Sequence, residues 1–195
     1  MPVRKKKAPS ARSGGDPKAR VVAAVLKLAA SKGWRRVSLA EIAAEARLPL
    51  AQLHALYRGK PMILGACLRF FDQAALNGPK PGAKDSKRDA LFDVLMRRFD
   101  ALKPHRQAVA SMLQGSIGDP AALLGFKRLL VSMGWMLEAA GVSSAGLPGQ
   151  ARRKILALVY ISVLIVFLND KSDDLAKTMA TLDRRLTLAQ VWLGL

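Results

Sequence analysis

The stretch RVSLAEIAAEARLPLAQLHALYRGK, residues 36–60, contains two short helical patterns joined by a tight turn. Ser38 is followed three residues later by Glu41, a spacing typical of a capping box, in which a hydroxyl and a carboxylate each satisfy a backbone donor. The pattern therefore predicts a helix that begins at Leu39. Leu48-Pro49 interrupts that helix, and proline suits the first turn of a new one.

Longer helical patterns flank this stretch on both sides. Apolar residues recur at three- and four-residue intervals between Asp16-Pro17, which starts a helix, and Gly33, which ends it. Arg58-Gly59 ends the third helix, and Lys60-Pro61 opens a fourth that is apolar from Ile63 to Phe71. Three helices with a tight turn between the second and third predict a helix-turn-helix unit, whose third helix enters the DNA major groove.

Helical spacing continues through the rest of the chain. Asn77–Lys87 is rich in proline, glycine and charge, so we expect a loop there, and Gly141–Gly149 is expected to be a flexible turn. Asn169–Ser172 supplies a turn and cap that join the last two helices as an antiparallel hairpin. Helices are expected at about 91–102, 104–116, 120–140, 155–168 and 175–193. No alternating β-branched pattern persists, so the sequence predicts an all-α fold with about nine helices.

The chain of 195 residues is basic and rich in apolar side chains. It has 32 Lys and Arg against 14 Asp and Glu, a net charge of +18 that points to nucleic acid or an anionic membrane as partner. Hydrophobic residues make up 51% of the chain, which excludes a wholly disordered basic protein. Residues 1–16 have almost no bulky apolar side chains and are predicted to form a disordered basic arm.

The composition also argues against several kinds of chemistry. Cys67 is the one cysteine, so the chain cannot form an intrachain disulfide and a cytoplasmic protein is expected. One cysteine and two histidines cannot supply a His/Cys zinc cage, so no metal site is expected. No phosphate-binding loop, nucleophile elbow or dinucleotide motif occurs, and we expect neither an enzyme nor a bound cofactor. The longest apolar run, Ile155–Leu168, has 14 residues, fewer than the ~20 of a membrane-spanning helix, so stable membrane insertion is not expected.

Residues 21–64 resemble the DNA-binding region of TetR-type transcriptional regulators. The resemblance rests on the Lys-Gly-Trp end of the first helix (residues 32–34), the Ser38 cap, the Ile42-Ala43 pair, Leu53, Tyr57 and Lys60. It implies a transcriptional repressor or activator that binds palindromic double-stranded DNA as a homodimer and responds to an apolar small-molecule effector. It also implies two domains, residues 17–62 for DNA binding and residues 63–195 for effector binding and dimerisation. The family usually has glycine in the turn where this chain has Arg47.

The candidate DNA contacts follow from this placement. The Lys60 ammonium and the helix N-terminus beside it can bind a phosphate, and Gln52 can pair with adenine. His54 can touch a base or a phosphate, and the basic arm can enter the minor groove or serve only as a solubilising tail. The predicted set is Lys5, Lys6, Lys7, Arg36, Ser38, Arg47, Leu50, Ala51, Gln52, His54, Tyr57 and Lys60.

Two further sets of residues are predicted in the C-terminal part. Bulky side chains that enclose an effector cavity, or else form plain core, are Phe92, Met96, Phe99, Met112, Phe126 and Trp135. Apolar residues of the last two helices that form a dimer interface, or else an internal hairpin, are Leu158, Ile161, Ile165, Leu175, Met179, Leu182, Leu186 and Leu193.

Two alternative functions stay open. Residues 99–106 and 156–186 resemble TetR-fold lipid-binding accessory proteins of ubiquinone biosynthesis. That resemblance implies an isoprenoid in a helical cavity and weak or no specific DNA binding. The basic arm by itself is also compatible with a protein that binds an anionic membrane surface.

Overall fold

A computed structural model describes residues 16–79, 82, 86–116 and 122–195. Within these ranges the chain forms nine α-helices and two 3-10 turns and contains no strand, which confirms the predicted all-α fold. The helices are α1 (Pro17–Lys32), α2 (Leu39–Glu45), α3 (Leu50–Leu56), α4 (Lys60–Leu76), α5 (Lys87–Leu102), α6 (Arg106–Ser116), α7 (Ala122–Ala139), α8 (Gly146–Asn169) and α9 (Ala176–Leu193). The 3-10 turns are Trp34–Arg36 and Lys103–His105. The arm residues Lys5, Lys6 and Lys7 lie outside the described ranges.

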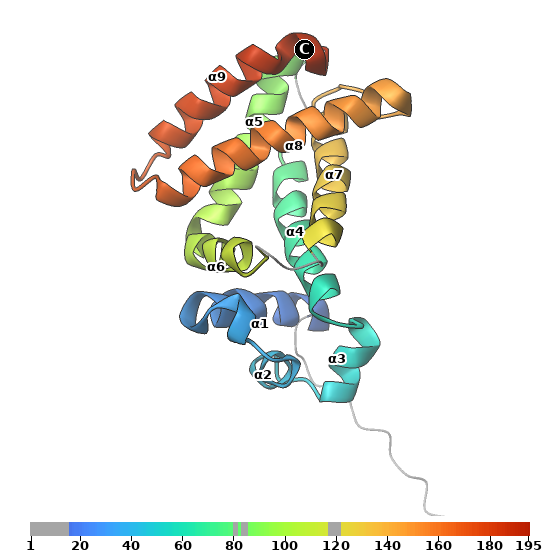
Figure 1. Cartoon of the computed structure of the whole chain (residues 1–195), viewed down its shortest axis with the longest axis vertical. Helices are drawn as coiled ribbons and strands as arrows, with labels where there is room; N and C mark the ends of the chain where they lie inside the picture. Colours follow the sequence, from blue (N-terminus) through green and yellow to red (C-terminus); the bar gives the residue numbers. More distant parts are fainter. Residues whose placement is uncertain (1–15, 80–81, 83–85, 117–121) are drawn as a thin grey trace, which may run out of the picture.

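The helices are arranged as a small N-terminal unit beneath a larger bundle (Figure 1). α1, α2 and α3 lie together at the bottom, and α4 rises from them into the bundle (Figure 1). α6 packs on α1, α4 packs against α5 and α7, and α8 pairs with α9. The long α4 therefore belongs to both parts, and α6 forms a second connection between them.

Buried apolar side chains and a helix cap hold the N-terminal unit together. Val25 of α1, Ile42 of α2 and Leu53 of α3 are almost completely buried. The Ser38 hydroxyl accepts a hydrogen bond from the backbone N–H of Glu41 at 3.2 Å, and the Glu41 carboxylate accepts one from the backbone N–H of Ser38 at 2.8 Å. The predicted capping box at the start of α2 is thus confirmed.

The turn between α2 and α3 depends on a left-handed residue. Arg47 has a φ of 54°. Its N–H bonds to the carbonyl of Ala44 at 3.0 Å, and the N–H of Leu48 bonds to the carbonyl of Ala43 at 2.9 Å. These two bonds are the Schellman pattern, which ends a helix through one left-handed residue, most often glycine. The chain therefore makes the helix-turn-helix turn with a residue type that rarely adopts this conformation.

Two predicted boundaries differ from the structure. The turn expected over Gly141–Gly149 ends earlier, because α8 begins at Gly146. The first turn of α8 packs closely on the backbone of Ser144, and Gly149 allows this contact. A Cβ atom at position 149 would lie 2.0 Å from the backbone carbon of Ser144. The helix expected from Pro104 begins at Arg106, after the 3-10 turn that contains the proline.

The last two helices, α8 and α9, form the expected antiparallel hairpin (Figure 1). Asp170 joins them, because its carboxylate accepts hydrogen bonds from the hydroxyl of Thr178 at 2.8 Å and the backbone N–H of Ser172 at 3.1 Å. Although burial raises the pKa of Asp170, these hydrogen bonds hold it well below its usual value. Among the helices that the structure describes, none has the length and apolar character needed to span a membrane.

Candidate DNA-binding surface and ligand cavity

The outer face of α3 is open to solvent. Leu50, Ala51, Gln52 and His54 are exposed on it, whereas Leu53 is only 1% exposed and anchors the helix to the unit beneath. The structure thus brings together on one face four residues of the predicted DNA-contact set. The amide of Gln52 and the imidazole of His54 are the polar groups on this face that can read base edges.

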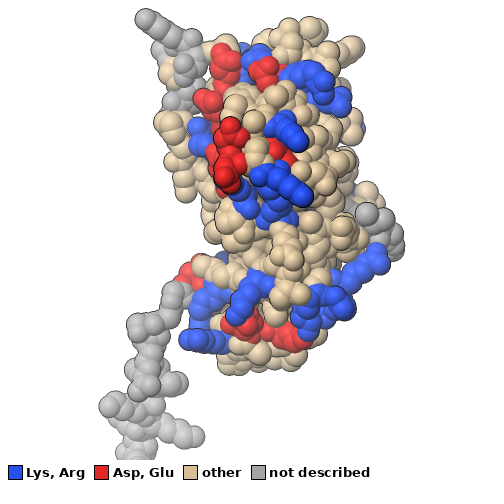
Figure 2. Space-filling model, turned by 90° about the vertical axis from the view of Figure 1, so that its left-hand side faces the viewer, with Lys and Arg blue, Asp and Glu red and all other residues tan. Residues whose placement is uncertain are grey.

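Cationic side chains surround this face. Arg36, Arg47 and Arg58 are exposed, and Figure 2 shows Lys and Arg on both flanks of the N-terminal unit with acidic side chains between them. Glu41 and Glu45 form ion pairs with neighbouring lysines of α1. The exposed arginines can contact phosphates without reading sequence.

Two residues predicted to contact DNA have structural roles. Tyr57 is 5% exposed, and its ring packs in the core at the end of α3, so it does not reach the outer surface. The Lys60 ammonium donates hydrogen bonds to the carbonyls of Trp34 at 2.9 Å and Val37 at 2.8 Å, and it lies 4.3 Å from the centre of the Trp34 ring. Lys60 therefore fastens the start of α4 to the connection between α1 and α2, a contact that we call the Lys60–Trp34 brace.

Ser38 is exposed as predicted, but its hydroxyl already has a partner. It donates to the Glu41 carboxylate at 2.8 Å and accepts from the Glu41 N–H. The pKa of Glu41 falls to about 2, mainly because Lys32 bonds to the carboxylate, with further contributions from the backbone and hydroxyl of Ser38. This position stabilises α2, and a phosphate there would have to share the Ser38 groups with Glu41.

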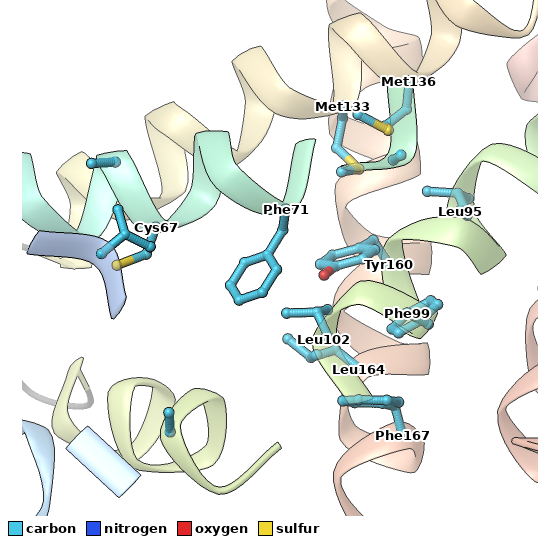
Figure 3. Close-up of a cluster of buried hydrophobic side chains, with 14 of the residues drawn as sticks. Cys67, Phe71, Leu95, Phe99, Leu102, Met133, Met136, Tyr160, Leu164 and Phe167 are labelled. Carbon is cyan, nitrogen blue, oxygen red and sulfur yellow. The ribbon is translucent and has the colours of Figure 1, made fainter. Parts of the chain in front are cut away.

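A cavity of about 1000 Å³ lies within the bundle and extends to the N-terminal unit. Its walls come from α4, α5, α6, α7 and α8, and at its lower end Trp34 and Lys60 reach it from the helix-turn-helix side. Figure 3 shows Phe71 of α4 and Leu102 of α5 near Tyr160 and Leu164 of α8, and these four side chains belong to the cavity wall. Its size and apolar walls suit a small organic molecule.

A buried ion pair stands at the wall of this cavity. Asp72 of α4 and Arg98 of α5 are 2.9 Å apart, and the Ser132 hydroxyl donates to the same Asp72 oxygen at 2.6 Å. The Arg98 guanidinium lies 4.5 Å from the centre of the Tyr160 ring. Sequence analysis missed this pair, although Asp72 is a carboxylate within the apolar pattern of the fourth helix and such a residue is a usable signal.

The predicted cavity residues divide into two groups. Met112 and Phe126 line the cavity. Phe99 is completely buried and stacks on Tyr160 with ring centres 5.3 Å apart, so it supports the wall from behind. Phe92 and Met96 pack against the core, and Trp135 is 59% exposed on α7. None of these last four residues is among the lining side chains.

The predicted interface residues also divide. Leu158, Ile165 and Met179 are exposed, so a partner can reach them. Ile161 lines the cavity. The remaining four are buried within the chain itself, because they form the inner face between α9 and the bundle, and they are core rather than interface: Leu175, Leu182, Leu186 and Leu193. No cluster of His, Cys, Asp or Glu suited to a metal ion occurs among the residues that were placed.

Comparison with solved structures identifies the fold. A TetR transcriptional regulator from Nitrosomonas europaea matches with a TM-score of 0.72 and 22% sequence identity, covering 91% of this chain and 99% of that chain. This chain has the TetR fold. A TetR transcriptional regulator from Rhodococcus sp. RHA1 matches with a TM-score of 0.68 and 20% identity, over 90% and 96% of the two chains. A TetR-family regulator from Streptomyces coelicolor matches with a TM-score of 0.59 and 15% identity, over 93% and 84%.

A sequence comparison points to a second group with this fold. A family model described as COQ9 matches residues 123–191, which include the end of the cavity wall and the α8–α9 hairpin. No curated protein matches the chain. The TetR fold agrees with the resemblance of residues 21–64 to TetR-type regulators. The COQ9 match agrees with the resemblance of the C-terminal part to lipid-binding accessory proteins of ubiquinone biosynthesis.

Proposed function

We propose that this chain is a TetR-type transcriptional regulator that binds double-stranded DNA through α3. The exposed outer face of α3 supports the proposal most directly, because Gln52 and His54 are presented there on an anchored helix. The arginines around it supply the phosphate contacts that hold such a helix in the major groove. The residues of the basic arm, Lys5 to Lys7, add charge close to the same unit in the chain.

The regulator acts as a homodimer in this proposal. Leu158 and Ile165 lie seven residues apart on α8 and are exposed, and Met179 is exposed on the neighbouring helix α9. An apolar face of this kind favours self-association about a two-fold axis. Two copies of α3 can then contact half-sites one helical turn apart, at a spacing of about 34–36 Å.

An apolar effector controls DNA affinity in this proposal. Trp34 and Lys60 line the cavity and also form the brace that fastens α4 to the helix-turn-helix unit. A ligand that favours a different position of either side chain shifts the population toward a different orientation of α3. The function is one of binding, and we expect no catalytic activity.

A band-shift series tests DNA binding. DNA from upstream of the chain's own gene is titrated with protein at several salt concentrations, and we expect affinity to fall as salt rises. Gln52→Ala is expected to change the preference among DNA sequences, whereas its control Arg36→Ala weakens all sequences alike. Affinity that is independent of salt, or a Gln52→Ala variant with unchanged preference, counts against the proposal.

A second candidate function is that of a lipid- or isoprenoid-binding accessory protein with weak or no specific DNA binding. The COQ9 match over residues 123–191 and the apolar cavity favour it. Purified protein is extracted with organic solvent and the extract analysed by mass spectrometry. A co-purified lipid together with sequence-independent DNA binding supports this function, and an empty extract counts against it.

A further inference from the structure

We propose that the cavity binds an amphiphile whose anionic oxygen head lies against Arg98 and whose apolar body extends toward Trp34. The inference rests on the proposed ligand-binding role of the cavity and names the chemistry of the ligand. It identifies Arg98 as the residue that determines specificity for the head.

Arg98 offers hydrogen-bond donors that its own surroundings do not satisfy. The side chain is 1% exposed and lines the cavity. One of its terminal nitrogens, Nη2, bonds to Asp72, but Nε and Nη1 are buried and have no hydrogen-bond partner among the residues described. Buried donors in native proteins are nearly always satisfied, and a guanidinium bonds only to acceptors. Neither nitrogen has surface open to the cavity, so a ligand oxygen becomes its acceptor when the guanidinium turns toward the cavity.

The charge of the cavity wall determines which charge the head group of the ligand can have. The lining side chains that carry charge are all cationic, namely Arg35, Lys60, Arg98 and Arg128, and none of the described lining residues is Asp or Glu. Asp72 stands behind Arg98 and is not part of the lining. Hydrogen bonds to an ionised acceptor are about twice as strong as neutral ones, so this wall favours an acid over an alcohol and excludes an amine.

The shape of the cavity fits a chain rather than a compact acid. Lining residues of α4 run from Lys60 to Phe71, a rise of roughly 17 Å along a helix. Leu64 and Leu68 of α4 and Val109 of α6 line this length with apolar side chains. A carboxylate or a phosphate monoester at Arg98 therefore has room for a long apolar tail below it.

Calorimetric titration of the full chain with matched sixteen-carbon ligands tests the head group. Palmitate and hexadecyl phosphate are compared with hexadecanol and hexadecylamine, all below their aggregation concentrations. We expect an acid to bind roughly 10- to 100-fold more tightly than the alcohol and the amine to bind most weakly. The stronger of the two acids identifies a carboxylate or a phosphate as the head. Equal affinity for palmitate, hexadecyl phosphate and hexadecanol overturns the proposal.

Two substitutions separate Arg98 from the general positive charge of the protein. Arg98→Met is expected to lose the preference for the acids and to keep hexadecanol binding, while Arg184→Met, which removes an exposed charge of α9, keeps the preference. Because Arg98→Met leaves Asp72 unpaired, Asp72→Asn is the second variant. It retains the shape of the site and removes the competing negative charge, so acid binding is expected to strengthen several-fold. Unchanged acid binding in both Arg98→Met and Asp72→Asn overturns the proposal.

The outcomes also separate this inference from the proposed regulator. DNA binding is measured on the same wild-type preparation in the absence of lipid. Acid-selective binding without sequence-specific DNA binding retains the inference and rejects the regulator. Specific DNA binding without acid selectivity retains the regulator and rejects the inference.

Discussion

The left-handed turn between α2 and α3 makes Arg47→Gly an informative substitution. A non-glycine residue in this conformation costs roughly 1–2 kcal/mol, whereas glycine adopts it freely. Glycine also loses more entropy on folding, by about 0.5–1 kcal/mol. The backbone bonds of the turn, from Arg47 to Ala44 and from Leu48 to Ala43, need no side chain and are kept. We therefore expect the free energy of unfolding to rise by about 0.5–1 kcal/mol.

Thermal unfolding measures this gain. In a protein of this size 1 kcal/mol shifts the midpoint by roughly 2–4 °C, so Arg47→Gly is expected to raise Tm by about 1–4 °C. Arg47→Ala is the matched control, because it removes the same charged side chain and retains the Cβ atom that causes the strain. A fall in Tm for Arg47→Gly, or an equal rise for Arg47→Ala, would refute the reasoning.

Although Arg47→Gly is expected to raise stability, it is expected to lower the affinity for DNA. Arg47 is exposed beside α3, and each phosphate contact contributes about −0.9 to the slope of log affinity against log salt. Both Arg47→Gly and Arg47→Ala should lower the affinity and reduce that slope by about the same amount. A slope unchanged in both variants would place Arg47 outside the DNA contact. The charged side chain and the strained backbone of one residue are thus measured separately.

Three further predictions concern other parts of the chain. Because the pKa of Glu41 is lowered from 4.5 to about 2, its contribution to stability is complete above pH 4.5 and is lost as the pH falls toward 2. The Tm difference between wild type and Glu41→Gln should therefore shrink over that range, and a constant difference would contradict the assignment. Lys60→Met should lower the free energy of unfolding by about 1–2 kcal/mol, because the Lys60 ammonium bonds to backbone carbonyls. The slope of log DNA affinity against log salt should stay the same, and a slope reduced by about 0.9 would instead assign Lys60 to a phosphate contact. Ile165→Arg should convert a dimer to a monomer in sedimentation experiments, whereas the control Leu147→Arg, also at an exposed position, should not. A dimer that Ile165→Arg leaves intact would exclude the exposed face of α8 as the interface.

Local signals in the sequence predicted most helix starts. The Ser38–Glu41 cap and the Asp16-Pro17 pair act through hydrogen bonds and backbone restrictions within a few residues. The helix starts that they set can therefore be predicted from the local sequence. The early start of α8 was missed because glycine and proline near Gly146 are typical of a turn. There the deciding factor is the close approach of Gly149 to Ser144, which exists only once the chain has folded.

The direction of side chains was harder to predict than the helices themselves. Helical spacing identified the apolar residues of α9 but left open whether a partner or the chain itself covers them, and Leu182 and Leu186 face the core. Lys60 was predicted to bind a phosphate because a helix N-terminus favours anions, and its hydrogen bonds to the carbonyls of Trp34 and Val37 were not predicted. Both cases depend on a neighbour distant in sequence, and spacing within one helix carries no information about such neighbours.

The Asp72–Arg98 pair illustrates the same limit and its functional consequence. The two residues lie on different helices, and although Asp72 stands out in the apolar pattern of its helix, only the folded bundle shows Arg98 as its partner at the cavity wall. A buried pair of this kind contributes little net stability, because desolvation offsets its attraction. Apolar side chains in place of Asp72 and Arg98 would stabilise the core equally well. A ligand with a polar head gives the pair a role that packing alone does not.

The position of the brace favours the regulator over a protein that only carries lipid. Trp34 and Lys60 belong to the helix-turn-helix side and still line the cavity, so in the proposed function an occupant of the cavity acts on the brace that fastens α4 to the connection between α1 and α2. A lipid carrier has no need for an anchored helix with Gln52 and His54 held outward, or for exposed arginines around it. The combination of a polar reading face and a cavity that reaches its support is what a ligand-controlled DNA-binding protein requires.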